Sequence, residues 1–172
     1  MFGLGCRDFK IAVYIANTPT MPEYQNLTQV NSLTRGEITA IGLACGNGWR
    51  KVFNVYAKLL FALPKEHFNF TLLAPTWQKY RDSFLLQANS QLVLLFSPPV
   101  LIKSSKVLHI ICGRTYAKAL IDNGSLSAQL TWLDDEFAID KENRVVVCPY
   151  FDYRQLSNVK IERLAVMLTA LK

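Results

Sequence analysis

Runs of apolar residues bounded by polar or turn-forming residues recur along the chain and predict strands. They cover residues 10–16, 68–74, 91–97 and 106–112. The run at 91–97 is apolar at consecutive positions and ends at two prolines, which is typical of a strand buried on both faces of a sheet. Shorter runs at 130–133, 137–139 and 144–148 predict an antiparallel hairpin near residues 130–148.

Apolar residues at helical spacing lie between these runs. Downstream of Gly48 they fall three, four and seven positions apart, and they predict a helix that ends at Pro64. Further helices are predicted from residue 76, over residues 113–122 and from residue 158 to the end. Residues 38–45 fit either a helix or a short strand, and the capping-box pattern of Thr34 and Glu37 favours the helix.

Strands that alternate with helices predict a single three-layer α/β/α domain over residues 1–172, with a mainly parallel sheet. A chain of 172 residues is long enough to bury a core without disulfides or a structural metal. The four cysteines, at positions 6, 45, 112 and 148, lack the close pairing of zinc ligands. We therefore expect reduced thiols, no metal site and no cofactor.

Basic residues exceed acidic ones only in the first three quarters of the chain. Residues 1–125 hold 13 Lys and Arg against 6 Asp and Glu, whereas residues 126–172 hold 6 against 7. This excess is compatible with a nucleotide or nucleic acid as partner. No run of Lys and Arg exceeds two residues, however, and an ordinary solvated surface explains the excess as well.

The apolar content bears on partners and location. Hydrophobic residues make up 51% of the chain, which favours a surface partly covered by a ligand or by a second copy in a homodimer. No uncharged apolar stretch reaches about 18 residues, so we expect no membrane span. The first residues lack the apolar core of a signal peptide, and we expect a cytoplasmic protein.

Three times an apolar run passes through a cysteine into a loop that carries an arginine. The pairs are Cys45 with Arg50, Cys112 with Arg114, and Cys148 with Arg154. If these runs are parallel strands, their carboxyl ends share one edge of the sheet, where open α/β sheets bind ligands. Arginines that converge there favour an anionic ligand.

Each of these loops also has a plain structural interpretation. Asn47, ahead of Arg50 in a glycine-rich loop, either helps to cradle an anion at a helix start or simply turns the chain between two helices. Arg114, where a strand leads into a helix, either binds a ligand or lies on the surface. Asp152, among aromatic residues, either orients a base or sugar or forms an internal brace with Arg154.

Conventional catalytic arrangements do not stand out. His109 lies among isoleucines inside a predicted strand, where a hydrogen-bonded core position is the simpler interpretation. The adjacent acids Asp134, Asp135 and Glu136 are more typical of a solvated face than of a metal site. There is no Ser–His–Asp order or paired-carboxylate spacing, and the sequence leaves open whether the chain is an enzyme.

Three segments, at residues 15–19, 110–113 and 147–154, together resemble the uracil-DNA glycosylase-like α/β fold in their order along the chain. In that fold the loop after the first strand holds a water-activating Asp or Asn, and a last strand ends in a His-Pro-Ser-type loop that enters DNA. The resemblance implies that Asn17 orients a water and that the loop around Pro149 approaches nucleic acid. Cys148 and Tyr150 stand where that family has its histidine. The whole chain also resembles small uncharacterised proteins of gammaproteobacteria, which implies no function.

The sequence supports two hypotheses of different classes. In the first, the chain binds an anionic, nucleotide-like ligand or nucleic acid at a sheet edge formed by Asn17, Arg114 and Arg154, with Arg50 close by. In the second, it is a non-catalytic homodimeric interaction protein without a small-molecule site. A deep polar cleft favours the first hypothesis, and a flat apolar face without a cleft favours the second.

Overall fold

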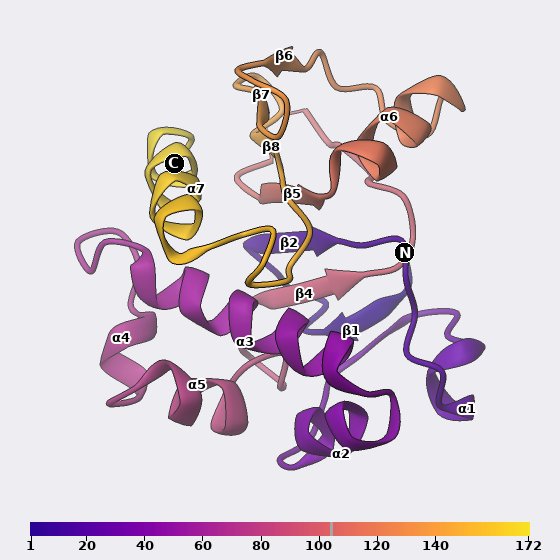
Figure 1. Ribbon diagram of the computed structural model, residues 1–172, viewed down its shortest axis with the longest axis vertical. Helices are drawn as coiled ribbons and strands as arrows, with labels where there is room; N and C mark the ends of the chain where they lie inside the picture. The colour runs from indigo at the N-terminus through magenta and orange to yellow at the C-terminus, as the bar shows by residue number, and fades with distance from the viewer. Residues whose placement is uncertain (104) are drawn as a thin grey trace.

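Four parallel strands form the centre of the fold, and every residue in them is buried. In this computed structural model, which describes residues 1–103 and 105–172, they are β2 (Ile11–Tyr14), β4 (Leu92–Leu95), β5 (Leu108–Cys112) and β8 (Val145–Cys148). They lie in the order β4-β2-β5-β8 within one mixed eight-stranded sheet (Figure 1). Parallel strands need crossover connections, and their two buried faces need a helical layer on each side.

Shorter strands complete the sheet on both sides. β1 (Gly3–Gly5) runs antiparallel to β4, and β3 (Val30–Asn31) is parallel to β1. On the other side, β7 (Ala138–Asp140) is antiparallel to β8, and β6 (Thr131–Trp132) is antiparallel to β7. The predicted α/β domain, its mainly parallel sheet and the hairpin near residues 130–148 are therefore confirmed.

The sequence does not predict β1, because two of its three residues are glycines. The structure needs glycine at both positions. A Cβ atom on Gly3 would lie 2.2 Å from the carbonyl oxygen of Leu94, and one on Gly5 would lie 2.3 Å from that of Leu92. Gly5 also has a φ of +129°, which disfavours other residues. The backbones of β1 and β4 thus approach each other where no side chain fits.

Helices cover both faces of the sheet (Figure 1). One hydrophobic cluster joins one face to α2 (Glu37–Ala44), α3 (Asn47–Ala62), α5 (Trp77–Ser83) and α7 (Asn158–Ala170). A second cluster joins the other face to α6 (Arg114–Asp122). The short helices α1 (Pro22–Gln25) and α4 (Phe70–Leu73) lie in the connections.

Helix α3 follows the predicted apolar spacing and is the central helix of its layer. Its residues Val52, Phe53 and Tyr56 are fully buried. The Tyr56 hydroxyl donates a hydrogen bond to the carbonyl oxygen of Val93 in β4 at 3.3 Å, so the one polar atom of this side chain is satisfied inside the core. This packing fixes the start of α3 near the carboxyl end of β4, where Trp49 meets Phe96 edge-on.

The predicted strand at residues 68–74 is wrong, because the structure forms the short helix α4 there. Phe68 and Phe70 stand two residues apart, which suggests strand alternation, yet they stack on each other with ring centroids 6.1 Å apart. Phe70 also meets Tyr80 of α5 edge-on. Contacts within the helical layer bury Phe70 and Ala74, so this segment needs no neighbouring strand.

Residues 38–45, which the sequence leaves open between helix and strand, form most of helix α2. The Glu37 carboxylate accepts a hydrogen bond from the backbone N–H of Thr34, as the capping-box pattern predicts. The Thr34 hydroxyl, however, donates to the same carboxylate at 2.6 Å instead of capping a helical amide. The helix therefore begins at Glu37, one residue after Gly36 in the left-handed region.

His109 of β5 is a buried core histidine. Its Nδ1 lies 2.7 Å from the hydroxyl oxygen of Tyr14 in β2, and the two rings stack. Burial lowers the pKa of His109 from 6.5 to about 4, and burial also raises the pKa of Tyr14. Both side chains are therefore neutral at pH 7, and they join two central strands by a hydrogen bond rather than by an ion pair.

The depressed pKa of His109 predicts a loss of stability in mild acid. The unfolded chain takes up a proton at this histidine below pH 6.5, whereas the folded chain does so only near pH 4. The contribution of His109 to the free energy of unfolding is therefore fully present above pH 6.5. It falls by about 3 kcal/mol between pH 6.5 and pH 4. Urea titrations at several pH values across this range measure the slope of the free energy of unfolding against pH.

His109→Gln retains a side chain that can hydrogen-bond to Tyr14 but does not titrate, so we expect a shallower slope in this variant. His67→Gln, which changes an exposed histidine, serves as the control and keeps the wild-type slope. An unchanged slope in His109→Gln would contradict the assignment.

Candidate functional site

The carboxyl ends of three neighbouring parallel strands meet at one edge of the sheet. β2 pairs with β5, and β5 pairs with β8 in a register that places Cys112 opposite Cys148. The sequence predicts this arrangement from the small or polar residues that follow each strand, and the structure confirms it. The loops after Tyr14, Cys112 and Cys148 therefore start side by side.

A pocket of about 580 Å³ lies at this edge. Its wall comes from the loop after β2, the turn from β5 into α6, the loop after β8 and the loop before β7. The lining residues that carry polar or charged side chains are Asn17, Arg114, Thr115, Tyr116, Asp135, Glu136, Tyr150 and Gln155. These polar groups share the pocket with a larger apolar surface.

Gly113 positions the start of α6 at the pocket. Its φ of +102° turns the chain sharply from β5 into the helix, and a Cβ atom there would meet nothing within 4 Å. No side chain caps α6. The first amides of a helix have no partner within it and carry the positive end of the helix dipole, so they offer hydrogen bonds to an anion in the pocket.

Arg114 is held at the pocket by an acidic neighbour. Its Nη1 donates to the Asp135 carboxylate at 2.8 Å and to the Asp135 carbonyl oxygen at 3.1 Å, and its guanidinium lies over the Trp132 ring. The Asp135 side chain is 93% exposed. An exposed ion pair of this kind is weak, so a ligand anion can replace the Asp135 carboxylate at Arg114.

Asn17 and Tyr150 also line the pocket. The Asn17 side-chain amide donates to the Tyr150 hydroxyl oxygen at 3.4 Å. Burial raises the pKa of Tyr150, and the hydrogen bond from Asn17 offsets part of this rise. Tyr150 therefore stays a neutral phenol and offers a hydrogen-bonding group beside an aromatic ring, which suits a base or sugar better than it suits proton transfer.

The structure brings Asp152 and Arg154 together outside this pocket. The Asp152 carboxylate accepts from Lys51 of α3 at 2.9 Å, from the Arg154 backbone N–H at 3.0 Å and from the Arg154 guanidinium at 3.5 Å. Desolvation raises the pKa of Asp152, but the hydrogen bonds from Arg154 and Lys51 outweigh it and lower this pKa to about 2. The geometry is that of a brace between the loop after β8 and the start of α3.

Asn47 and Arg50 lie at the start of α3 and do not line the pocket. Both are exposed. A Cβ atom on Gly42 would lie 3.5 Å from the Arg50 Cβ, which places Arg50 against α2. Of the six residues proposed from the sequence, the structure therefore brings Asn17 and Arg114 to one pocket, joins Asp152 to Arg154 next to it, and leaves Asn47 and Arg50 on the helical side.

The cysteines at this edge are poor nucleophiles. Cys112 and Cys148 are buried, and both are free thiols. Burial, followed by the hydrogen bond with Cys148, raises the pKa of the Cys112 thiol. Cys112 lines the bottom of the pocket as a neutral, apolar group, and this argues against thiolate chemistry there.

The acidic residues before β7 were interpreted as a solvated face, and the structure gives them defined partners. Asp134 accepts from Arg163 and from the backbone N–H groups of Glu136 and Phe137, the latter two at 2.8 Å each. Glu136 accepts from Lys160 of α7 at 2.7 Å. Sequence reasoning missed Asp135 and Glu136 as pocket residues, because only the fold places this loop opposite the start of α6.

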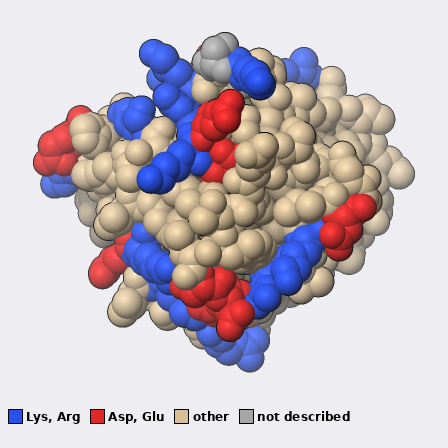
Figure 2. All heavy atoms as spheres, turned by 90° about the horizontal axis from the view of Figure 1, so that it is seen from above, with Lys and Arg blue, Asp and Glu red and all other residues tan. Residues whose placement is uncertain are grey.

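Charge at the molecular surface is mixed. On the face seen from above in Figure 2, basic and acidic side chains are interspersed on a largely uncharged surface. Within residues 1–103 and 105–172, no cluster of three or more His, Cys, Asp or Glu side chains is arranged to hold a metal ion. No helix in the same residues combines the length and the apolar character that crossing a membrane requires.

These features define an α/β domain with a pocket at the carboxyl edge of its sheet, beside the start of α6. The chain belongs to a family of unknown function (DUF6942), whose profile matches residues 2–169. No curated protein and no solved structure matches it. Membership of an uncharacterised family is therefore confirmed, whereas these comparisons give no support to the uracil-DNA glycosylase-like resemblance or to a gammaproteobacterial origin.

We expect substitutions at the Asp152 brace and at the pocket residue Arg114 to change the free energy of unfolding by different amounts. Asp152→Ala removes the partner of the half-buried Lys51 and an acceptor for the Arg154 amide, so we expect it to cost about 1–3 kcal/mol. Arg114→Ala and Arg154→Ala change exposed side chains and cost at most about 1 kcal/mol each. Chemical denaturation measures all three. A much larger loss for Arg114→Ala would show that Arg114 is a structural brace rather than a group available to a ligand.

Proposed function

We propose that the chain binds a small anionic, nucleotide-like ligand in the pocket at the carboxyl edge of its sheet. The observation that carries this proposal is the uncapped start of α6, which faces the pocket next to Arg114. A phosphate group fits this combination, because the first helical amides and a guanidinium both donate hydrogen bonds to its oxygens.

The remainder of the pocket suits the organic part of such a ligand. Tyr150 and Asn17 offer an aromatic surface and hydrogen-bonding groups in the same pocket. A volume of about 580 Å³ lies in the ordinary range for small-molecule sites. Within this proposal, Asp135 competes with the ligand, since its carboxylate occupies Arg114 in the free protein.

Calorimetric titration with nucleoside monophosphates tests the proposal. We expect Arg114→Ala to weaken binding about tenfold or more, because it removes a charge-assisted hydrogen bond. Asp135→Asn should strengthen binding, because it removes the competing negative charge. Arg50→Ala, which changes an exposed arginine outside the pocket, is the control and leaves affinity unchanged.

Two results would contradict the proposal. One is the absence of binding by any nucleoside monophosphate or by inorganic phosphate at millimolar concentration. The other is binding that Arg114→Ala and Asn17→Ala leave unchanged while Arg50→Ala weakens it.

Nucleic acid carries the same anionic phosphate groups as a nucleotide and is the larger candidate ligand. Because the basic residues are spread singly along the sequence, we expect few phosphate contacts and weak binding, with a dissociation constant of roughly 10⁻⁴–10⁻⁶ M. A fluorescence titration with labelled oligonucleotides at about 50 mM salt measures this affinity, which should fall steeply as salt rises. No binding at high micromolar protein would limit the proposal to small ligands.

The proposal uses the uracil-DNA glycosylase-like resemblance for the location of the ligand site and not for the reaction. It agrees with a ligand site formed by the loops after β2, β5 and β8, with Asn17 in the place of the water-orienting residue. The position of the family's histidine, however, is taken by the buried Cys148 and by Tyr150, which is a neutral phenol. We therefore propose binding at this edge and not base excision.

A homodimeric interaction protein is the alternative. The observation that favours it is on α7, where Val159 and Val166 are 75% and 70% exposed and stand seven residues apart on one side of the helix. Sedimentation analysis of the wild type and of a Val159→Lys/Val166→Lys variant tests this alternative. A wild-type dimer that the variant abolishes would support it, and a monomer at all concentrations would rule it out.

A further inference from the structure

The opposite edge of the sheet, where the parallel strands begin, gathers basic residues. Lys10 directly precedes β2, Lys106 stands two residues before β5, and Arg144 directly precedes β8. Backbone hydrogen bonds fix their relative positions. The Leu108 amide donates to the Lys10 carbonyl oxygen, and the His109 amide donates to that of Arg144, both at 2.9 Å. These three basic residues, which come from separate parts of the sequence, thus lie beside the start of β5.

These cations have no acidic partners. Among the described residues, no carboxylate lies within ion-pairing distance of Lys10, Lys106 or Arg144. The Arg144 guanidinium donates only a long bond, of 3.4 Å, to the Lys106 carbonyl oxygen. Cations without an acidic partner leave a positive potential at this edge, so an anion that binds among them is stabilised.

The same three residues line a cavity of about 1070 Å³, which is larger than the pocket at the carboxyl edge. Its other wall comes from α4, α5 and the loops at residues 65–69 and 87–91, and it includes aromatic side chains. These aromatic residues are Phe68, Phe70, Tyr80 and Phe84. Lys172 reaches this wall, donates to the His67 carbonyl oxygen and lies over the Phe68 ring. The cavity therefore combines a cationic side with an aromatic side.

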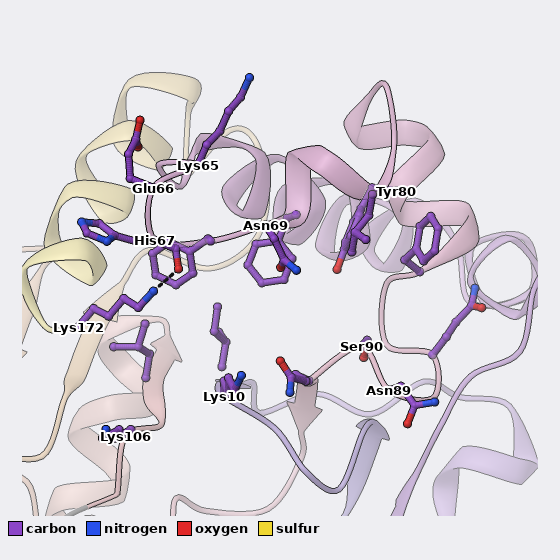
Figure 3. Close-up of a pocket in the computed structure, with 18 of the residues that line it drawn as sticks. Lys10, Lys65, Glu66, His67, Asn69, Tyr80, Asn89, Ser90, Lys106 and Lys172 are labelled. Carbon is purple, nitrogen blue, oxygen red and sulfur yellow. Dashed lines mark hydrogen bonds between the residues drawn. The ribbon is translucent and has the colours of Figure 1, made fainter.

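Figure 3 shows how the labelled side chains are oriented around this cavity. Lys65 and Glu66 point away from it, and Glu66 is the one acidic residue that lines it. Lys172, Asn69 and the Tyr80 hydroxyl point toward it. Among the described residues, the interior thus presents positive charge and neutral polar groups, and no acidic side chain points into it.

Tyr80 offers a hydrogen-bonding group to a ligand. Its side chain belongs to the core, and its ring is held by Phe61, Phe70 and Phe84. The hydroxyl points into the cavity (Figure 3). A hydroxyl at a cavity wall can donate to an acceptor atom of a bound ligand.

We propose that this cavity binds an organic anion with an aromatic body. The anionic group binds among Lys10, Lys106 and Arg144, and the aromatic body packs against Phe70 and Phe84. The Tyr80 hydroxyl donates to an acceptor atom of the ligand. This site lies at the edge of the sheet opposite to the nucleotide-like site and shares no lining residue with it.

Calorimetric titration with 1-naphthyl phosphate tests the proposal, because this probe combines the two required parts. Inorganic phosphate, 1-naphthol and decanoate are the comparison ligands, and each lacks the aromatic body or the negative charge. We expect one binding site for 1-naphthyl phosphate and at least about tenfold weaker binding of each comparison ligand. Equal binding of 1-naphthol would overturn the role of the cations, and equal binding of phosphate or decanoate would overturn the role of the aromatic wall.

Variants locate the binding site. Lys10→Gln and Lys106→Gln should each weaken the binding of 1-naphthyl phosphate about fivefold, as expected for partly exposed charges. Lys79→Gln is the matched control, since it makes the same change on the exposed side of α5, next to Tyr80, outside the cavity. Arg114→Ala is the control for the other edge. Loss of binding in either control, with no loss in Lys10→Gln and Lys106→Gln, would overturn the proposed location.

Tyr80→Phe removes one oxygen atom and leaves the aromatic packing intact. We expect this variant to weaken the binding of 1-naphthyl phosphate several-fold and to leave the melting temperature of the free protein unchanged, because the ring keeps its contacts. A lower melting temperature with unchanged affinity would show that the hydroxyl serves the fold, and it would overturn the role of Tyr80 in binding.

Discussion

The parallel pairing of four fully buried strands is the constraint on which the rest of the structure depends. Once β4, β2, β5 and β8 run side by side in one direction, every connection between them must cross a face of the sheet, and helices must cover both faces. The same pairing collects all four strand starts at one edge and all four strand ends at the other. Loops from distant parts of the sequence thereby gather into two groups, one at each edge of the sheet.

The two edges differ in how their charges are balanced. At and near the carboxyl edge, cations have acidic partners: Arg114 pairs with Asp135, Lys51 with Asp152, and Lys160 with Glu136. These acids come from residues 126–172, the part of the chain without a basic excess. At the amino edge, Lys10 and Lys106 come from the basic part and have no such partners among the described residues. The uneven charge of the sequence thus becomes an uneven charge between the two edges of the sheet.

The sequence predicts the centre of this fold well, because buried strands and amphipathic helices leave local periodic patterns. It fails where tertiary contacts decide the structure. Residues 68–74 pack as a helix within the helical layer, and β1 is a strand of glycines that only its fit against β4 explains. In the same way, Asn17 and Arg114 could be placed at one edge from the ends of their strands. Asp135 could not, since its loop reaches the pocket only through the β6-β7-β8 arrangement.

The amino edge carried a signal of the same kind as the carboxyl edge. Parallel pairing brings strand starts together just as it brings strand ends together, and a cation stands one or two residues before β2, β5 and β8. The cavity also includes features that cost folding energy. Three of its residues, Asn89, Gln91 and Arg144, are non-glycine residues with φ between +54° and +64°. Such conformations cost about 1–3 kcal/mol each and persist only where the surrounding structure imposes them. They make this edge a place where the chain gives up stability, which is the expected behaviour of residues kept for binding rather than for folding.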